Sequence, residues 1–233
     1  MDRPERALVI TPHPDDAEIG CGGTVAGWIA EGTEVYYVLC TNGDKGTSDP
    51  DLTSVRLAEI REREQAEAAE VLGIKEVVYL RYPDGGLEDT SEFRGHLVHA
   101  IRRLRPDVVF ATDPHRRSFY LHRDHRLCGQ VTMDAVFPFA RDRLHYPEHI
   151  TEDGLETHKV GDVLFWGTEE PDTFVDITDT IDLKIESLKK HASQVSSDDG
   201  TDVGEFVRAN ARRIGQRADM PYAEAFRRIH IRS

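Results

Sequence analysis

Apolar runs alternate with helix-like spacing along most of the chain. Short continuous apolar runs are typical of buried strands, and apolar residues three or four apart are typical of helices. The patterns predict strands over 7–10, 35–40, 76–80 and 107–111, each followed by a helix, over 19–30, 54–72, 93–104 and 124–137. Later patterns predict strands over 160–166 and 174–177, and helices over 179–190 and 203–217, followed by a tail.

This alternation predicts an α/β protein with a single doubly wound, mostly parallel (Rossmann-like) sheet and helices on both faces. We treat residues 1–233 as one domain, with a core over 1–138 and an appended portion over 139–233. The appended portion is expected to form a smaller C-terminal lobe beside the site. Its irregular segment 139–159 is expected to shape the substrate pocket.

The composition excludes some classes of molecule as binding partners of this protein. The net charge of −14 argues against nucleic acid or an anionic membrane, because a phosphate-rich surface would be repelled. No apolar run approaches the ~20 residues of a membrane span, and no signal-peptide pattern precedes the first strand. We therefore expect a cytoplasmic protein. Cys21, Cys40 and Cys128 are widely spaced, which favours reduced, buried thiols over a disulfide framework or a structural zinc site.

A polar cluster, 11–18, separates the first predicted strand from the first helix. In open α/β sheets, ligands bind at such strand-to-helix connections, beyond the carboxyl ends of the strands. His13 and Asp16 are three residues apart and could converge on one ion, leaving Asp15 pointing elsewhere. The alternative is that Asp15 and Asp16 only cap the helix N-terminus, where carboxylates satisfy free backbone N–H groups.

A second polar cluster, 120–125, follows the fourth predicted strand. The ends of strands one and four can be adjacent where the strand order of a parallel sheet reverses, so His122 and His125 would face His13 and Asp16. Two histidines and a carboxylate form many catalytic zinc sites. The same donors also accept iron or cobalt. The alternative is a charged helical turn with no special role.

The two clusters together favour a metal-dependent hydrolase. Asp15, next to a ligand but free, could take the proton from the attacking water. The oxyanion formed at a carbonyl needs a hydrogen-bonding partner, which His122 could supply. Asp124 could orient the His122 imidazole.

The chain resembles the PIG-L/LmbE-like family of zinc-dependent N-acetylglucosamine deacetylases. The family includes deacetylases of the mycothiol and bacillithiol pathways, of GPI-anchor synthesis and of diacetylchitobiose. The resemblance rests on ordered matches over most of the chain, at 12–18, 19–24, the His-x-Asp-His of 122–125, 41–47, 56–59, 68–69, 72–73, 175–178, Lys184 and 191–194.

The resemblance implies roles for individual residues. His13, Asp16 and His125 match the metal ligands, Asp15 the general base, and His122 the histidine that stabilises the oxyanion or protonates the leaving amine. Tyr120 matches a tyrosine that lies near the oxyanion. Arg56 matches an arginine at the substrate pocket; the alternative for Arg56 is an ordinary exposed cation on a helix. Arg123 replaces the family's usual proline, which adds a cation near the pocket. The family often forms trimers or hexamers, so we expect a homo-oligomer.

The leading hypothesis is removal of an acetyl group from an N-acetylglucosamine-type sugar or glucosaminyl conjugate. The alternative enzyme is an amidase acting on a thiol conjugate or another acylated amine. A dinucleotide-binding protein is disfavoured because the third glycine of its fingerprint would fall at Val25. A non-catalytic metal-binding protein would not need both Asp15 and His122.

Overall fold

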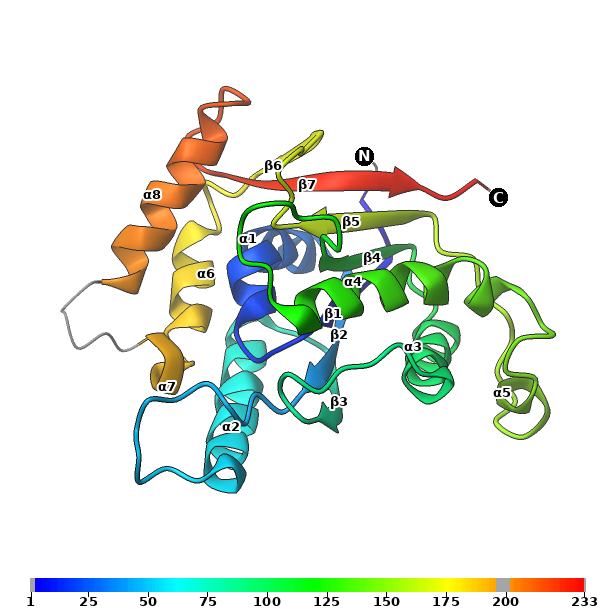
Figure 1. Ribbon diagram of the computed structural model, residues 1–233. Helices are drawn as coiled ribbons and strands as arrows, with labels where there is room; N and C mark the ends of the chain where they lie inside the picture. The colour runs from blue at the N-terminus through cyan, green and yellow to red at the C-terminus, as the bar shows by residue number, and fades with distance from the viewer. Residues whose placement is uncertain (1–2, 196–201, 233) are drawn as a thin grey trace.

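The computed structural model describes residues 3–195 and 202–232, which are built around one seven-stranded sheet with the order β3-β2-β1-β4-β5-β7-β6 (Figure 1). All six predicted strands are present. The strands are β1 (Arg6–Thr11), β2 (Glu34–Thr41), β3 (Glu76–Tyr82), β4 (Val108–Thr112), β5 (Asp162–Trp166), β6 (Thr173–Asp176) and β7 (Ala223–His230).

Strand β1 lies between β2 and β4, and both pairings are parallel. Ala7 is in register with Val35 of β2 on one side and with Val108 of β4 on the other. The order reverses here because the chain moves outward from β1 to β2 and β3 before it returns to β4. Only β7 runs against the other strands, so the prediction of a mostly parallel sheet is confirmed.

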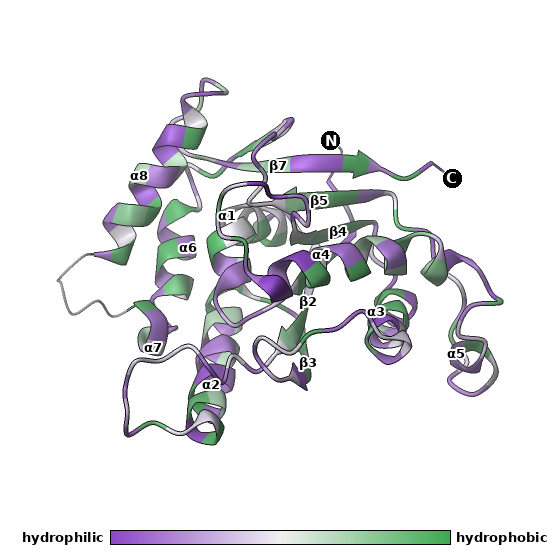
Figure 2. Cartoon of the chain, viewed as in Figure 1, coloured by the Kyte–Doolittle hydropathy of each residue, from purple (hydrophilic) through white to green (hydrophobic). Residues whose placement is uncertain are grey.

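Helices cover both faces of the sheet because alternate side chains of each strand point to opposite faces. Leu8 and Ile10 pack with α3 and α4, whereas Ala7 and Val9 pack with α1. Figure 2 shows hydrophobic strands inside and hydrophilic surfaces on the outer helices. The longer helices are α1 (Asp16–Ala30), α2 (Ser54–Leu72), α3 (Ser91–Leu104), α4 (Arg123–Val136), α6 (Ile181–Leu188) and α8 (Val203–Gly215).

The expectation of a tail after the last helix is wrong, because β7 lies there between β5 and β6. Its charged residues interrupt the apolar pattern that marks the other strands. Glu224 is buried against Lys184, and Arg227 and Arg228 pair with Asp113 and Asp162. Tertiary partners therefore stabilise charges that made this segment resemble a surface tail.

The portion after Phe139 contributes β5, β6 and β7 to the sheet and also a group of helices beside α1 and α2 (Figure 1). These are α6, α8 and the short α7 (Ala192–Val195). Segment 139–159 contains the 3₁₀ helix η1 (Phe139–Arg141) and α5 (Glu148–Thr151). Within the described ranges, no helix is long and apolar enough to cross a membrane.

Candidate metal centre

A cavity of about 250 Å³ opens at the carboxyl ends of β1 to β4, where the strand order reverses. The predicted residues His13, Asp15, Asp16, Tyr120 and His122 line it. Segment 139–159, which was expected to shape the pocket, contributes no lining residue. The remaining lining residues are Lys45, Gly46, Arg61, Asp84 and Gln194.

The structure brings together His13, Asp16 and His125, the three predicted metal ligands. One donor atom from each lies within 4.8 Å of the other two. Asp16 Oδ2 is 3.0 Å from His13 Nδ1 and 3.0 Å from His125 Nε2. All three side chains are buried, so the donors are held by packing around them.

The second nitrogen of each ligand histidine also has a partner. His125 Nδ1 is 3.3 Å from Thr112 Oγ1. His13 Nε2 is 3.1 Å from Asp124 Oδ2 and 3.1 Å from Asp84 Oδ1. Such partners fix the tautomer and orientation of a ligand histidine. Asp124 was expected to orient His122, but its carboxylate instead lies against His13 and accepts hydrogen bonds from the backbone N–H groups of Gly85 and Leu87.

The donor set fits a divalent cation. His125 Nε2 is buried and has no hydrogen-bond partner among the described residues, although it faces Asp16. A cation bound between His125 Nε2 and the Asp16 carboxylate would give both groups a partner. In the protein alone, burial lowers the pKa of His13, but Asp124, Asp16 and Asp84 together raise it to about 12, so His13 carries a proton there. Bound metal would replace that proton.

A second group of donors shares His13 and adds Asp84, His122 and Asp124. Its donor atoms also lie within 4.8 Å of one another. Asp124 is already held by two backbone N–H groups, and His122 is 3.9 Å from Asp84. His13, Asp16 and His125 are therefore the candidate ligands, and the second group lies around them as support.

Asp15 occupies the N-cap position of α1 in the left-handed region, with φ 90° and ψ −28°. Its side chain makes no capping hydrogen bond, so the capping alternative does not hold for Asp15. The backbone instead directs the adjacent carboxylates of Asp15 and Asp16 apart. Burial and the charge of Asp16 raise the pKa of Asp15 to about 7, while Arg61 opposes the shift. A carboxylate with this pKa suits a general base near neutral pH.

His122 presents a hydrogen-bond donor to the cavity. It is the N-cap of α4, and its Nδ1 accepts a hydrogen bond from the backbone N–H of Asp124 at 3.2 Å. Burial and the charge of His13 lower the pKa of His122, so the neutral ring carries its proton on Nε2. The Tyr120 ring stacks on His122 with centroids 6.1 Å apart and meets His125 edge-on at 4.9 Å.

Arg56 does not reach this cavity. Its exposed guanidinium pairs with Glu59 at 2.9 Å on the surface of α2, as the alternative interpretation expected. The arginine in the cavity is Arg61, which is buried and donates to the carbonyls of Pro14 at 2.7 Å and Gly43 at 3.0 Å. Arg61 also lies 3.3 Å from Asp15 Oδ2. A Cβ on Gly43 would come within 2.6 Å of this guanidinium, so the loop requires glycine there.

The sequence did offer a signal for these missed residues. Arg61, Glu64 and Gln65 occupy the buried face of α2, at the helical spacing shared with Leu57 and Ala68. Polar residues at core positions indicate a functional or pairing role. Asp84 lies two residues after the end of β3, at the same edge of the sheet as His13. Arg123 is the first residue of α4 and donates to the Leu87 carbonyl, so it fits where the family has proline.

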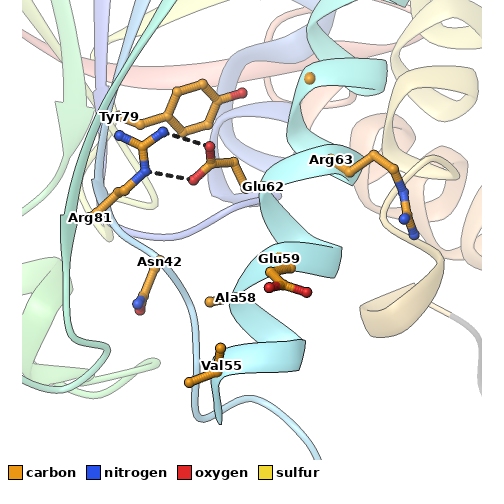
Figure 3. Close-up of a pocket in the computed structure, with 9 residues that line it drawn as sticks. Asn42, Val55, Ala58, Glu59, Glu62, Arg63, Tyr79 and Arg81 are labelled. Atoms are coloured by element: carbon orange, nitrogen blue, oxygen red, sulfur yellow. Dashed lines mark hydrogen bonds and ion pairs between the residues drawn. The ribbon is translucent and has the colours of Figure 1, made fainter. Parts of the chain in front are cut away.

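A larger hollow of about 650 Å³ lies between α2 and β3 (Figure 3). Its principal ion pair joins Arg81 to Glu62 at 2.7 Å, shown by the dashed lines in the figure. Its described lining residues include no histidine or cysteine, and the charges of Arg81 and Glu62 satisfy each other. The clustered histidines and carboxylates therefore belong to the smaller cavity.

The fold and the donors define an open α/β protein with a candidate site for one divalent cation at its strand ends. Residues 8–136 match the PIG-L family, described as GlcNAc-PI de-N-acetylase. The chain belongs to this family.

Individual relatives extend the match beyond those residues. The chain is 34% identical over 223 residues to a diacetylchitobiose deacetylase of Thermococcus kodakarensis, covering 96% of this chain and 82% of the relative. It is 32% identical to a mycothiol S-conjugate amidase of Streptomyces coelicolor, covering 61% of this chain and 55% of the relative. The structure of N,N'-diacetylchitobiose deacetylase from Pyrococcus horikoshii, solved with its inhibitor MPG, superposes with a TM-score of 0.90 at 35% identity, covering 97% of this chain and 84% of that one.

Proposed function

We propose that this protein is a zinc-dependent N-deacetylase that removes the acetyl group from an N-acetylglucosamine-type sugar or glucosaminyl conjugate. The observation that carries the proposal is that donor atoms of His13, Asp16 and His125 converge, beside the Asp15 carboxylate, which is not one of these donors. Similarity to a diacetylchitobiose deacetylase over almost the whole chain supports this substrate class.

The cavity residues divide the chemistry between them. His13, Asp16 and His125 would hold a zinc ion, which would supply Lewis-acid chemistry toward the amide carbonyl and the attacking water. Asp15 takes a proton from the attacking water, whose oxygen forms the new bond to the acetyl carbon. His122 Nε2 donates to the carbonyl oxygen as negative charge develops there. The C–N bond then breaks, the proton held by Asp15 passes to the leaving amine, and acetate is released.

Three other side chains have supporting roles in this proposal. Tyr120 lies against both His122 and His125, and this contact supports a role for Tyr120 near the oxyanion. Asp124 holds the His13 imidazole from the side opposite Asp16. Arg61 ties the Asp15 turn to α2 through the Pro14 carbonyl.

The first experiment measures acetate release from chitooligosaccharides and glucosaminyl conjugates by zinc-loaded protein. We expect Asp15→Asn to lower kcat by about 10²- to 10⁴-fold, the usual contribution of a general base. Bound zinc should be retained because Asp15 is not a ligand. Near-full activity of the variant would remove Asp15 from the mechanism.

A panel that includes cysteinyl conjugates separates the second candidate function. The similarity to a mycothiol S-conjugate amidase favours including it. Preference for these conjugates over acetylated amino sugars would establish the amidase and overturn the proposed substrate. The cytoplasmic location and the homo-oligomer, a trimer or hexamer, stay predictions.

A further inference from the structure

Three carboxylates crowd the first turn of α1, and each faces a basic side chain from a different part of the chain. Asp16 lies 3.0 Å from His125 of α4, and Asp15 lies 3.3 Å from Arg61 of α2. Glu18 Oε2 lies 3.3 Å from Nε2 of His191, which follows α6. The first two pairs belong to the site already described. The third has no part in the proposed chemistry.

Glu18 and His191 are both completely buried. Gln65 donates to Glu18 Oε1 at 3.0 Å, while Glu18 Oε2 makes no hydrogen bond within the described ranges. Neither ring nitrogen of His191 makes one there either. Burial of a carboxylate is costly without a paired charge. Burial alone lowers the pKa of His191, but Glu18 raises it above the ordinary value, which favours the cation.

The segment that carries His191 is fixed to the same surroundings by other side chains. Ser193 donates two hydrogen bonds to the Glu64 carboxylate of α2. Its backbone nitrogen lies 2.9 Å from Glu64 Oε1 and its hydroxyl oxygen 2.6 Å from Glu64 Oε2. Gln194 donates to the Gly46 carbonyl at 3.0 Å and lines the cavity. Ser187 of α6 donates to the Ala68 carbonyl at 2.9 Å. The residues around His191 therefore connect α6, α2 and the mouth of the cavity.

We propose that His191 is a positioning residue: by pairing with Glu18 in the interior, it holds the first turn of α1 so that Asp16 can bind the metal. His191 lies beyond residues 8–136, which match the family model, and within segment 191–194, one of the segments that resemble the family in sequence. The inference rests on the proposed metal site.

The physical reason is the short distance along the chain between Glu18 and the ligand Asp16. Without the imidazole, the Glu18 carboxylate would be buried with only Gln65 as a partner. The turn would then shift to bring the carboxylate toward water, and Asp16 would move with it. Removing a group that orients a metal ligand typically weakens metal binding by about 10- to 100-fold.

The test compares His191→Gln, the double variant Glu18→Gln/His191→Gln, and a matched control, Glu224→Gln. Glu224 forms another buried ion pair against α1, with Lys184, and accepts from the N–H groups of Gly23 and Thr24 in the next turns. Zinc affinity is measured by competition with a chromophoric chelator, without substrate. Thermal denaturation reports the stability of each variant.

We expect His191→Gln to weaken zinc binding by at least about 10-fold. The double variant should recover to within about threefold of the wild type, because no unpaired charge remains. Glu224→Gln should lower the Tm but leave zinc affinity within about threefold of the wild type. Unchanged affinity in His191→Gln, or an equal loss in Glu224→Gln, would overturn the proposal.

If His191→Gln does not fold, the double variant still decides the question. Charge pairing predicts that adding Glu18→Gln restores a folded, zinc-binding protein, whereas an imidazole needed only for packing leaves the double variant unfolded. Failure of the wild type to release acetate would overturn the proposed function without affecting the zinc measurement.

Discussion

At the scale of single residues, the candidate site depends on how the backbone separates two adjacent carboxylates. The positive φ of Asp15 directs its carboxylate toward Arg61, while Asp16 faces His13 and His125. The sequence predicted this separation from the spacing of His13 and Asp16. The helical spacing of Arg61 with Leu57 and Ala68 indicated burial, but the sequence could not show that its guanidinium reaches Asp15 and the Pro14 carbonyl.

Asp15 should lower the stability of the metal-free protein at neutral pH. Its pKa is about 7 in the folded protein and about 3.9 in an unfolded chain. Because the folded state binds the proton more tightly, stability falls as pH rises from about 4 to about 7. Asp15→Asn removes this loss, so its Tm should exceed that of the wild type by an amount that grows over this range.

Thermal denaturation in the presence of a chelator, at several pH values from about 4 to about 8, checks this prediction. The Tm values of the wild type and of Asp15→Asn should differ least at the lowest pH. A variant less stable than the wild type at the alkaline end would show that Asp15 is stabilised as an anion.

Arg61 and Arg56 offer a matched pair on one helix. Arg61→Lys should lower kcat/KM by at least about 10-fold, because a lysine cannot reach the Pro14 and Gly43 carbonyls and Asp15 together. Arg56→Lys alters an exposed pair worth only about 0–1 kcal/mol and should leave kcat/KM unchanged. A larger loss of kcat/KM in the Arg56 variant than in the Arg61 variant would indicate that Arg56 contacts the substrate.

At the scale of elements, one buried side chain organises the segment after α4. Arg102 of α3 is almost fully buried and donates to five backbone carbonyls, those of Phe139, Ala140, Asp142, His145 and Tyr146. This explains how an irregular segment is ordered without a regular strand or long helix. Periodicity could not predict it, because the contacts join one side chain to the backbone of a distant segment.

Arg102→Met should therefore destabilise the protein by about 3 kcal/mol, since several buried carbonyls would lose their donor. For a chain of this size, that corresponds to a fall in Tm of about 6–12 °C. The neighbouring Arg103, paired with Glu76 at the surface, is the control, and Arg103→Met should cost only about 0–1 kcal/mol.

Thermal and urea denaturation measure both effects, and zinc affinity should be unchanged in each variant because neither arginine lines the cavity. Equal Tm values for the two variants would show that Arg102 does not order the segment.

At the scale of the whole molecule, the sheet order places the carboxyl ends of β1 and β4 side by side. The apolar runs predicted these strands because parallel strands are buried on both faces and lack polar interruptions. β7 was missed because Glu224, Arg227 and Arg228 require partners that only the folded chain supplies. The same limit applies to the place of Gln194 in the cavity, which it reaches from a segment far along the chain.

The central claim is that His13, Asp16 and His125 hold one divalent cation. The most direct measurement is an anomalous difference map at the zinc absorption edge, from crystals grown with zinc. We expect one strong peak at about 2.0–2.2 Å from a donor atom of each of these three residues. A peak bound instead by Asp84, His122 and Asp124, or no peak in this cavity, would contradict it.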